Sequence, residues 1–164
     1  MKKLYMIGGA MGVGKTTVCQ TLKAQLPNCV FLDGDWCWDA DPFCVTEETK
    51  QMVLNNICYL LNSFIGCSAY QNIVFCWVMH EQGIIDSIVN RLDTKDCAVV
   101  PISLLANEET IQKRIMDDVD KGKRTEDVFL RSLNYLPRYH TLNTAKIETD
   151  GKTPARIAQE IGWL

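Results

Sequence analysis

Short apolar runs alternate along the chain with segments in which apolar residues recur every three or four positions. Apolar runs of four to eight residues are typical of buried strands, whereas the wider spacing is typical of amphipathic helices. The predicted strands are residues 4–7, 29–32, 73–79, 98–105 and 146–149. Because strands and helices alternate, the pattern predicts an α/β fold with a parallel sheet. Pro101 is unusual in such a strand, since it has no N–H to donate.

The predicted helices fill the intervals between these strands and follow the last one. The first extends from a glycine-rich loop to Leu26, and Pro27 ends it. A long helix begins at Thr46 with two glutamates in its first turn, which suit the positive end of the helix dipole. The last helix begins at Thr153-Pro154, with proline at the favoured first helical position. Further helices are expected over residues 84–92, after Asn107 and over residues 126–136.

Composition and charge fit one globular domain. The chain has 164 residues, of which 47% are hydrophobic and 23% are charged, and its formal net charge is −3. A domain of this size buries enough surface to fold without disulfides or metals. The negative charge argues against binding to nucleic acids or to anionic membrane surfaces. We therefore expect a single domain over residues 1–164, as a monomer or a small homo-oligomer.

The eight cysteines include no Cys-x-x-Cys pair. Neither His80 nor His140 has the spacing to a cysteine that a zinc site uses. Several cysteines lie in apolar runs, as Cys76 does, and there a free thiol acts as a small hydrophobic side chain. Free thiols indicate a reducing compartment, and the sequence has no convincing signal-peptide cleavage site and no apolar run of about 18 residues. These features predict a cytoplasmic protein without a membrane span.

A glycine-rich loop over residues 9–16 matches the phosphate-loop pattern G-x-x-x-x-G-K-Ser/Thr, and it lies between a predicted strand and a predicted helix, as this motif requires. Its glycines allow a backbone nest whose N–H groups face a phosphate, and the start of the helix adds unpaired N–H groups. Lys15 is expected to contact the β- and γ-phosphates and Thr16 to ligate Mg²⁺. The motif therefore predicts Mg·ATP binding. The expected nucleotide contacts are Gly9, Ala10, Met11, Gly12, Val13, Gly14, Lys15, Thr16 and Thr17.

Three other classes of phosphate-loop protein lack their motifs in this sequence. A regulatory GTPase needs Asn-Lys-x-Asp and Asp-x-x-Gly, and a transport-type ATPase needs Leu-Ser-Gly-Gly-Gln; none of these occurs. An AAA-type motor needs four apolar residues followed by two acids. Residues 29–33 begin in this way, but Gly34 replaces the second acid.

The second predicted strand ends in Phe31-Leu32-Asp33-Gly34-Asp35. This segment resembles the Leu-Asp-Gly-Asp of adenylylsulfate and gluconate kinases and the Asp-x-Asp of shikimate kinase. The resemblance extends to the order of parts along the whole chain and implies a three-layer sandwich with a five-stranded parallel sheet in the order 2-3-1-4-5. It also implies that Asp33 assists Mg²⁺ and that Asp35 holds the acceptor hydroxyl. The chemistry agrees, because phosphoryl transfer uses a carboxylate that takes the hydroxyl proton.

The charged segment over residues 117–124 resembles the lid of these kinases, so we expect a lid near residues 117–131. Arginines in such a lid neutralise charge in the transition state. Arg124 is the first candidate, and the alternatives are Arg114, Arg131 and Arg138.

Three tryptophans lie at or near the predicted strand ends that would face the acceptor. Trp36 and Trp38 come directly after Asp35, and Trp77 lies late in the third predicted strand. We expect these rings to bind the acceptor, although tryptophans also serve as core residues. Where shikimate kinase has three glycines, this chain has residues 77–82 without such a stretch, so no motif identifies the acceptor.

Together these features predict a Mg·ATP-dependent kinase that phosphorylates a hydroxyl, or a phosphate, of a small molecule. A nucleoside or nucleotide kinase is the alternative within this class. A non-catalytic ATP-binding regulatory module is the alternative from another class, and it would have no need of Asp35 beside the γ-phosphate. A kinase of nucleic-acid ends is disfavoured by the negative net charge.

Overall fold

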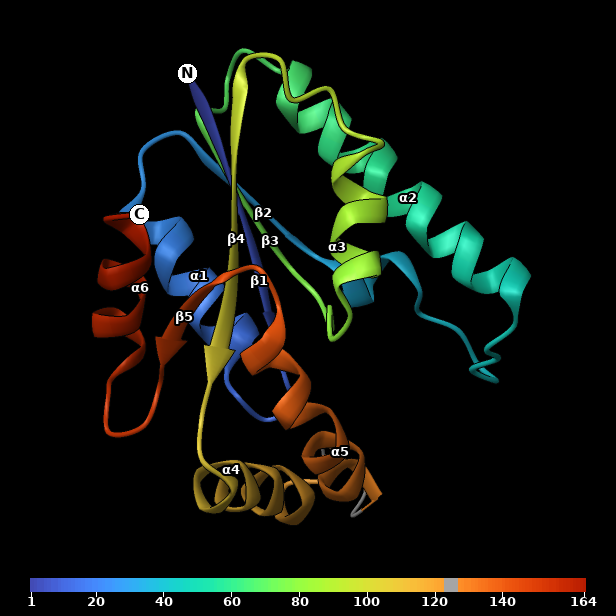
Figure 1. The fold of residues 1–164 in the computed structure, drawn as a ribbon, viewed down its shortest axis with the longest axis vertical. Coiled ribbons are helices and arrows are strands. Elements are labelled where there is room, and N and C mark those ends of the chain that lie inside the picture. Colours follow the sequence, from blue (N-terminus) through green and yellow to red (C-terminus); the bar gives the residue numbers. More distant parts are fainter. Residues whose placement is uncertain (123–126) are drawn as a thin grey trace.

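The computed structural model describes residues 1–122 and 127–164. Five strands form one central sheet (Figure 1), and every neighbouring pair is parallel. The strands are β1 (Lys2–Gly9), β2 (Cys29–Asp33), β3 (Asn72–Cys76), β4 (Cys97–Leu105) and β5 (Ala145–Glu148). Their order is β2-β3-β1-β4-β5, which confirms the order implied by the sequence resemblance.

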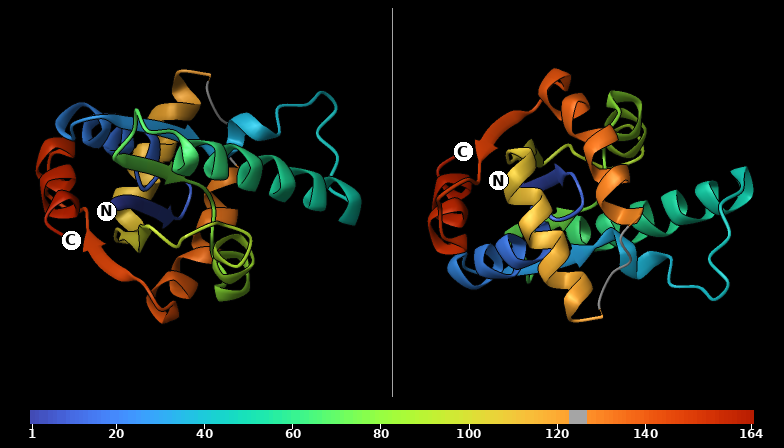
Figure 2. Two further views of the ribbon diagram at one scale, coloured as in Figure 1. Left: turned by 90° about the horizontal axis from the view of Figure 1, so that it is seen from above. Right: turned by 90° about the horizontal axis from the view of Figure 1, so that it is seen from below.

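Helices cover both faces of the sheet. They are α1 (Lys15–Gln25), α2 (Glu47–Gly66), α3 (Gln82–Val89), α4 (Glu108–Asp120), α5 (Asp127–Thr141) and α6 (Pro154–Gly162). Helices α1 and α6 pack together on one face, and α2, α3 and α5 lie on the other (Figures 1 and 2). The three-layer α/β architecture is therefore confirmed. Helix α4 lies below the carboxyl ends of the strands (Figure 1).

The centre of the core is β1, which has strands on both sides and helices over both faces. Its residues from Leu4 to Gly9 are all buried, which explains why the sequence shows an unbroken apolar run there. Pro101 is accommodated in β4 opposite Met6, just before Ile102–Leu105, the part of β4 that also pairs with β5. The missing N–H of Pro101 thus falls outside the doubly paired part of this strand.

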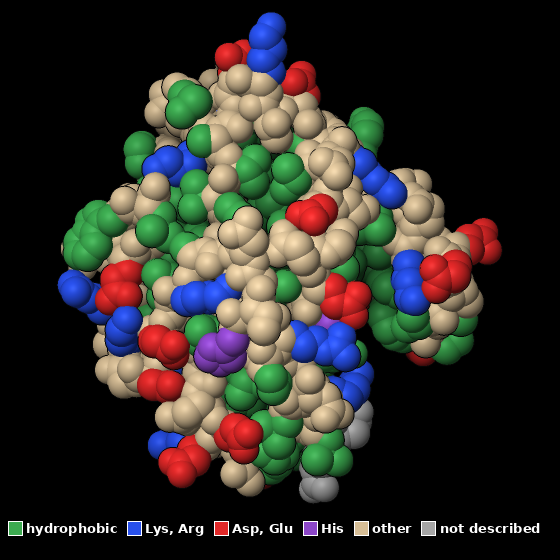
Figure 3. Space-filling view, viewed as in Figure 1, with side chains coloured by type: hydrophobic (Ala, Val, Ile, Leu, Met, Phe, Trp, Pro, Cys, Tyr) green, Lys and Arg blue, Asp and Glu red, His purple; other side chains and the backbone are tan. Residues whose placement is uncertain are grey.

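All eight cysteines are free thiols, and Cys19, Cys58, Cys76 and Cys97 are buried. Within the described residues, no group of three or more His, Cys, Asp or Glu side chains could hold a metal. No helix in the described part of the chain is long and apolar enough to cross a membrane. Figure 3 shows one face of the molecule, on which basic and acidic side chains are interspersed.

Several predicted boundaries are wrong; the helix predicted over residues 84–92, for example, is α3, which ends at Val89. The strand predicted over residues 73–79 ends at Cys76, which pairs with Ile7 of β1 and with Asp33 of β2. Strand β2 ends at Asp33, so the residues beyond Cys76 have no strand to pair with on that side. The helix predicted over residues 126–136 continues as α5 to Thr141 and includes Pro137, because Tyr139 beyond the proline is fully buried.

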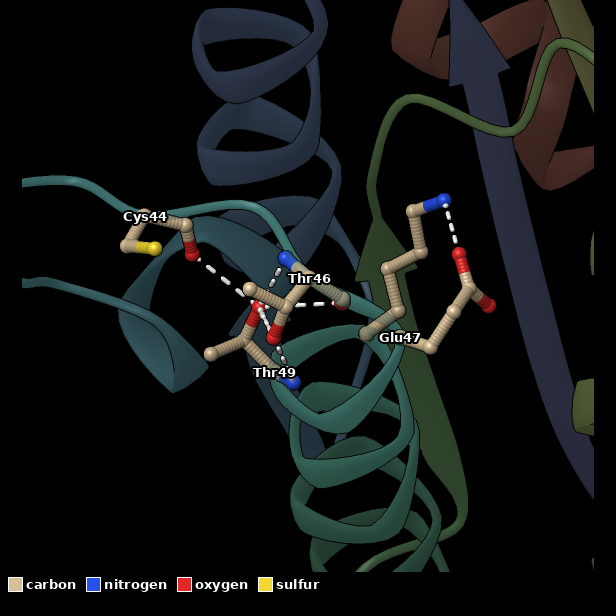
Figure 4. A network of polar contacts seen from close by, with 5 residues as sticks. Cys44, Thr46, Glu47 and Thr49 are labelled. Carbon is tan, nitrogen blue, oxygen red and sulfur yellow. Dashed lines mark hydrogen bonds and ion pairs between the residues drawn. The ribbon is translucent and has the colours of Figure 1, made fainter.

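Helix α2 begins with a capping box (Figure 4). The Thr46 hydroxyl accepts a hydrogen bond from the Thr49 backbone N–H at 3.1 Å, and the Thr49 hydroxyl accepts one from the Thr46 N–H at 2.8 Å. The Thr49 hydroxyl also lies 3.0 Å from the Cys44 carbonyl oxygen, to which it can donate. These bonds fix the direction in which the preceding segment enters the helix.

Replacing Thr46 with Ala should lower the free energy of unfolding by about 1 kcal/mol, because the Thr49 N–H loses its partner. The measurement is urea denaturation followed by circular dichroism. The control is Lys50→Ala, which removes only the surface ion pair with Glu47 and should have a smaller effect. Equal losses in the two variants would show that the cap is not a determinant of stability.

Candidate active site

The phosphate loop is the turn between β1 and α1, and glycine is required at several of its positions. Gly12 and Gly14 have φ angles of 83° and 99°, which side chains other than glycine rarely adopt. A Cβ atom on Gly12 would also lie 2.7 Å from Cγ1 of Ile115 in α4. A Cβ atom on Gly9 would lie 2.7 Å from Cγ1 of Val13. The motif therefore reflects both backbone conformation and close contact.

Two side chains from other helices bind carbonyl groups of this loop. The fully buried Ser132 of α5 donates its hydroxyl to the Met11 oxygen at 2.7 Å. Arg114 of α4 donates Nη1 to the Val13 oxygen at 2.8 Å. In a trans peptide the C=O and the following N–H point in opposite directions. The N–H groups that follow Met11 and Val13 therefore point away from Ser132 and Arg114 and stay available to an anion, as a nest requires.

The cation of the motif lies over the loop. Lys15 donates Nζ to the carbonyl oxygens of Gly9 at 2.8 Å and Ala10 at 3.1 Å. Its positive charge thus stands beside the N–H groups of the nest and the start of α1, which also favour an anion. This arrangement suits the triphosphate of a nucleotide.

A hydroxyl and a carboxylate meet beside the loop. Thr16 donates Oγ1 to Oδ2 of Asp33 at 2.9 Å, and Asp33, at the end of β2, is only 6% exposed. The other carboxylate oxygen of Asp33 accepts the Asp35 backbone N–H at 3.1 Å and caps a short 3₁₀ helix, η1 (Gly34–Cys37). Hydroxyl and carboxylate oxygens are the ligands that Mg²⁺ prefers, usually alongside waters and substrate phosphates. Thr16 and Asp33 therefore fit a magnesium ion.

A cavity of about 600 Å³ brings most of the predicted site residues together. Lys15, Thr16, Thr17, Asp33 and Asp35 all line it. The rest of the wall comes from loop residues, from Val18 and Val78, from α4 (Arg114, Asp117, Asp118), from Lys121, and from Lys152, Pro154 and Ile157 near the start of α6. Asp35 is exposed, and it lines the same space as the phosphate loop.

The segment expected to form the lid is partly helical. Residues 117–120 are the end of α4 and not a turn, because Ile111 and Ile115 are buried and Val119 packs against the core one turn later. The first lid candidate, Arg124, lies outside the described residues. Among the alternatives in the described part of the chain, Arg114 lines the cavity.

Arg138 lies in a cluster that joins α5 to the segment after β3. It binds Glu81 at 2.8 Å, and its guanidinium carbon lies 5.4 Å from the centre of the Tyr135 ring. The His80 ring stacks on Tyr135 at 4.1 Å, and burial lowers the pKa of His80, which favours the neutral ring. This cluster positions α5 and therefore Ser132, which binds the phosphate loop.

The tryptophans do not share the cavity of the phosphate loop. Trp77 packs against Gly34 so closely that a Cβ atom on Gly34 would lie 2.6 Å from Cγ and Cδ1 of the ring. Trp36 and Trp38 line a second cavity of about 530 Å³, next to η1. Asp35 and the two rings that follow it thus line different cavities, although all three belong to or flank η1.

Two groups of site residues were missed by the sequence analysis. Ser132 had no signal, because a serine within a helix pattern does not reveal which carbonyl it contacts. Lys152 and Pro154 could have been found, since they follow the last strand and the carboxyl ends of parallel strands lie on one edge.

Comparisons with known proteins agree with this architecture. A model of the AAA domain family matches residues 6–131. A gluconokinase from Sinorhizobium meliloti 1021 superposes with a TM-score of 0.68 at 16% identity, covering 97% of this chain and 89% of that one. A tunicamycin resistance protein from Deinococcus radiodurans gives 0.67 at 19% identity, with coverages of 99% and 95%. Shikimate kinase from Acinetobacter baumannii, in complex with shikimate, gives 0.63 at 19% identity, with coverages of 98% and 90%.

A search of curated proteins finds no sequence match. At these identities, the similarity to solved structures shows a shared phosphate-loop kinase fold. The match is to the AAA domain family as a whole. It is therefore compatible with Gly34 at the position where an AAA-type motor has its second acid.

Mg·ATP should stabilise the protein by about 2.7 kcal/mol at a concentration about 100-fold above its dissociation constant. The reason is the nest with Lys15 beside it, and the measurement is a thermal melt with and without Mg·ATP. Lys15→Ala should lose most of the increase in Tm, whereas Lys113→Ala, an exposed lysine outside the described cavity lining, should keep it. An unchanged Tm of the unmodified protein would exclude nucleotide binding at this loop.

Gly34→Ala should lower the free energy of unfolding by about 1–3 kcal/mol, because the added methyl group overlaps the Trp77 ring. Chemical denaturation measures this loss. Gly66→Ala provides the matched control, since a Cβ atom there meets nothing within 4 Å. If both variants unfold like the parent, the contact between Gly34 and Trp77 does not constrain the site.

Proposed function

The chain belongs to the AAA domain family, and on that premise we propose that it is a Mg·ATP-dependent kinase that phosphorylates a hydroxyl group of a small molecule. One observation carries the proposal: Asp35 lines the same cavity as Lys15 and Thr16. Asp33 already supplies a carboxylate for the magnesium ion, so binding of Mg·ATP alone has no need of Asp35. Asp35 is useful when a hydroxyl has to lose its proton as it attacks the γ-phosphorus.

In this proposal the phosphate loop binds the triphosphate. The nest and Lys15 would hold the β- and γ-phosphates, and Thr16 and Asp33 would hold the magnesium ion. Bound Mg²⁺ would neutralise charge on the phosphate oxygens. Asp33 is suited to this task because its carboxylate is already fixed by Thr16 and by the Asp35 N–H.

Asp35 would act on the acceptor. Its carboxylate accepts a hydrogen bond from the acceptor hydroxyl and takes the proton as the oxygen attacks the γ-phosphorus. A new P–O bond forms to the acceptor, the bond between the γ-phosphorus and the β,γ-bridging oxygen breaks, and ADP leaves. Because Asp35 is exposed, it can meet an acceptor that approaches from solvent.

Cations would close the site from the side of α4. A lid near residues 117–131 would form part of the single domain. Arg124 is the first candidate for the arginine that neutralises charge in the transition state. This role for Arg124 is supported by the sequence alone. Arg114 already lies beside the loop, where its Nη1 binds Val13. Closure over both substrates would limit wasteful hydrolysis of ATP.

The acceptor class is supported by the similar structures, two of which are named as gluconokinase and shikimate kinase. These names favour a small hydroxyl compound. A nucleoside or nucleotide kinase remains the alternative within the same chemistry. A non-catalytic ATP-binding module is disfavoured by the position of Asp35 in the cavity.

Asp35→Asn keeps the shape of the side chain and removes the base. With an acceptor found by screening nucleosides, sugars and antibiotics for ATP consumption, kcat should fall by about 10²–10⁴-fold while Mg·ATP still binds. The control is Asp93→Asn, which changes an exposed aspartate in a cavity away from the phosphate loop. Asp33→Asn should instead raise the Mg²⁺ concentration needed for activity.

Near-full activity of Asp35→Asn would move the base to another residue. Loss of Mg·ATP binding in the same variant would mean that Asp35 is part of the nucleotide site and not of the acceptor site.

A further inference from the structure

The second cavity lies between η1, the segment that follows it and the start of α2. Its volume is about 530 Å³, which is within the usual range of small-molecule sites. The residues that line it are Trp36, Cys37, Trp38, Asp39, Ala40, Pro42, Cys44, Thr49, Met52 and Asn56. In Figure 2, α2 and the segment before it, which supply much of this lining, extend beyond the sheet.

Large apolar side chains remain exposed here. Trp36 is 60% exposed and Met52 is 42% exposed, and Phe43, which stacks on Trp38 with ring centres 4.5 Å apart, is 60% exposed. Exposed apolar side chains that gather at one hollow indicate a binding site. Aromatic rings bind planar or apolar groups well, because they offer a large rigid surface.

The walls of the cavity are fixed from several sides. Asn56 of α2 donates Nδ2 to the Cys37 carbonyl oxygen at 3.2 Å, which joins α2 to η1. The Thr49 hydroxyl lies 3.0 Å from the Cys44 carbonyl oxygen at the other end of the segment. Gly34 is held against Trp77. A ligand therefore meets a largely preformed site and does not have to organise it.

The charge of the lining selects against anions. Among the described residues that line the cavity, Asp39 is the only charged one. Burial, together with the nearby carboxylates of Asp33 and Asp35, raises the pKa of Cys37, so this wall keeps a neutral thiol. A phosphate or carboxylate bound here would lose water and find no cation in the described lining, which is costly.

The cavity is close to the proposed base. Trp38 donates its backbone N–H to the Asp35 carbonyl oxygen at 3.2 Å, so the two residues are one 3₁₀ turn apart. At about 2 Å of rise per residue, this turn spans about 6 Å along the helix axis. A molecule of two or three rings could place a hydroxyl at Asp35 and a ring against Trp36 or Trp38.

We propose that this cavity binds the body of the phosphoryl acceptor, and that the acceptor is an uncharged or cationic hydroxyl compound with an aromatic or apolar face. Nucleosides and aryl alcohols fit this class. Nucleotides, sugar phosphates and carboxylic acids do not. The inference rests on the proposed kinase function, since it joins the cavity to Asp35.

The first experiment measures binding and needs no turnover. The probes are naphthylmethanol and the hydroxymethyl naphthoic acid that differs from it by one carboxylate, in the presence of Mg²⁺ and a non-hydrolysable ATP analogue. Saturation-transfer NMR gives the dissociation constants. The parent protein should bind the alcohol at least about tenfold more tightly than the acid, because the described lining offers the acid no cation.

Two variants test the location. Trp36→Ala should weaken binding of the alcohol by about fivefold or more, since it removes the stacking surface. Trp163→Ala is the matched control, because Trp163 is 66% exposed and lies at the end of α6. Met52→Lys adds a cation at the rim and should tighten binding of the acid. Equal binding of the alcohol to Trp36→Ala and Trp163→Ala, or tight binding of the acid by the parent, would overturn the proposal.

The second experiment separates this inference from the proposed function. In an ATP-consumption screen, nucleosides are compared with nucleoside monophosphates, and neutral alcohols with hydroxy acids. Consumption with the uncharged members supports both proposals. Consumption only with the phosphorylated or acidic members would overturn the acceptor class and leave the kinase function intact. Binding of naphthylmethanol that depends on Trp36, without ATP consumption by any hydroxyl compound, would instead contradict the kinase function and with it the acceptor role of the cavity.

Discussion

The site depends on the orientation of the peptide groups in the phosphate loop. Ser132 and Arg114 bind the Met11 and Val13 carbonyl groups, and the N–H groups that follow these carbonyl groups point the opposite way. Ser132 belongs to α5 and Arg114 to α4, so the loop depends on the packing of two helices that are distant in the sequence.

The same edge of the sheet organises the acceptor side. Strand β2 ends at Asp33, which binds Thr16 with one carboxylate oxygen and begins η1 with the other. Residues of this one short helix thus line two cavities: Asp35 lines that of the phosphate loop, and Trp36 lines the other. The close contact between Gly34 and Trp77 explains why a glycine, and not a second acid, stands between the two aspartates.

The sequence predicted the elements that depend on local pattern, and it failed where distant contacts decide. The strand before the loop and the helix after it follow from an apolar run, a glycine motif and helical spacing. The end of β3 at Cys76 could not be predicted, because it depends on where β2 runs out. Likewise, α5 continues past Pro137 through the burial of Tyr139, and the contact of Ser132 with Met11 joins residues 121 positions apart. That Asp35 and the two rings after it line different cavities also required the three-dimensional structure.

The most direct test of this account is a crystal structure with Mg²⁺ and a non-hydrolysable ATP analogue. The account predicts the triphosphate in the nest of residues 9–16, with Lys15 Nζ moved from the Gly9 and Ala10 oxygens to the β- and γ-phosphates. Thr16 Oγ1 should have exchanged Asp33 for the metal, and the Ser132 and Arg114 bonds to the loop should be unchanged. A nucleotide bound elsewhere, or a loop whose Met11 and Val13 carbonyl groups have turned inward, would contradict it.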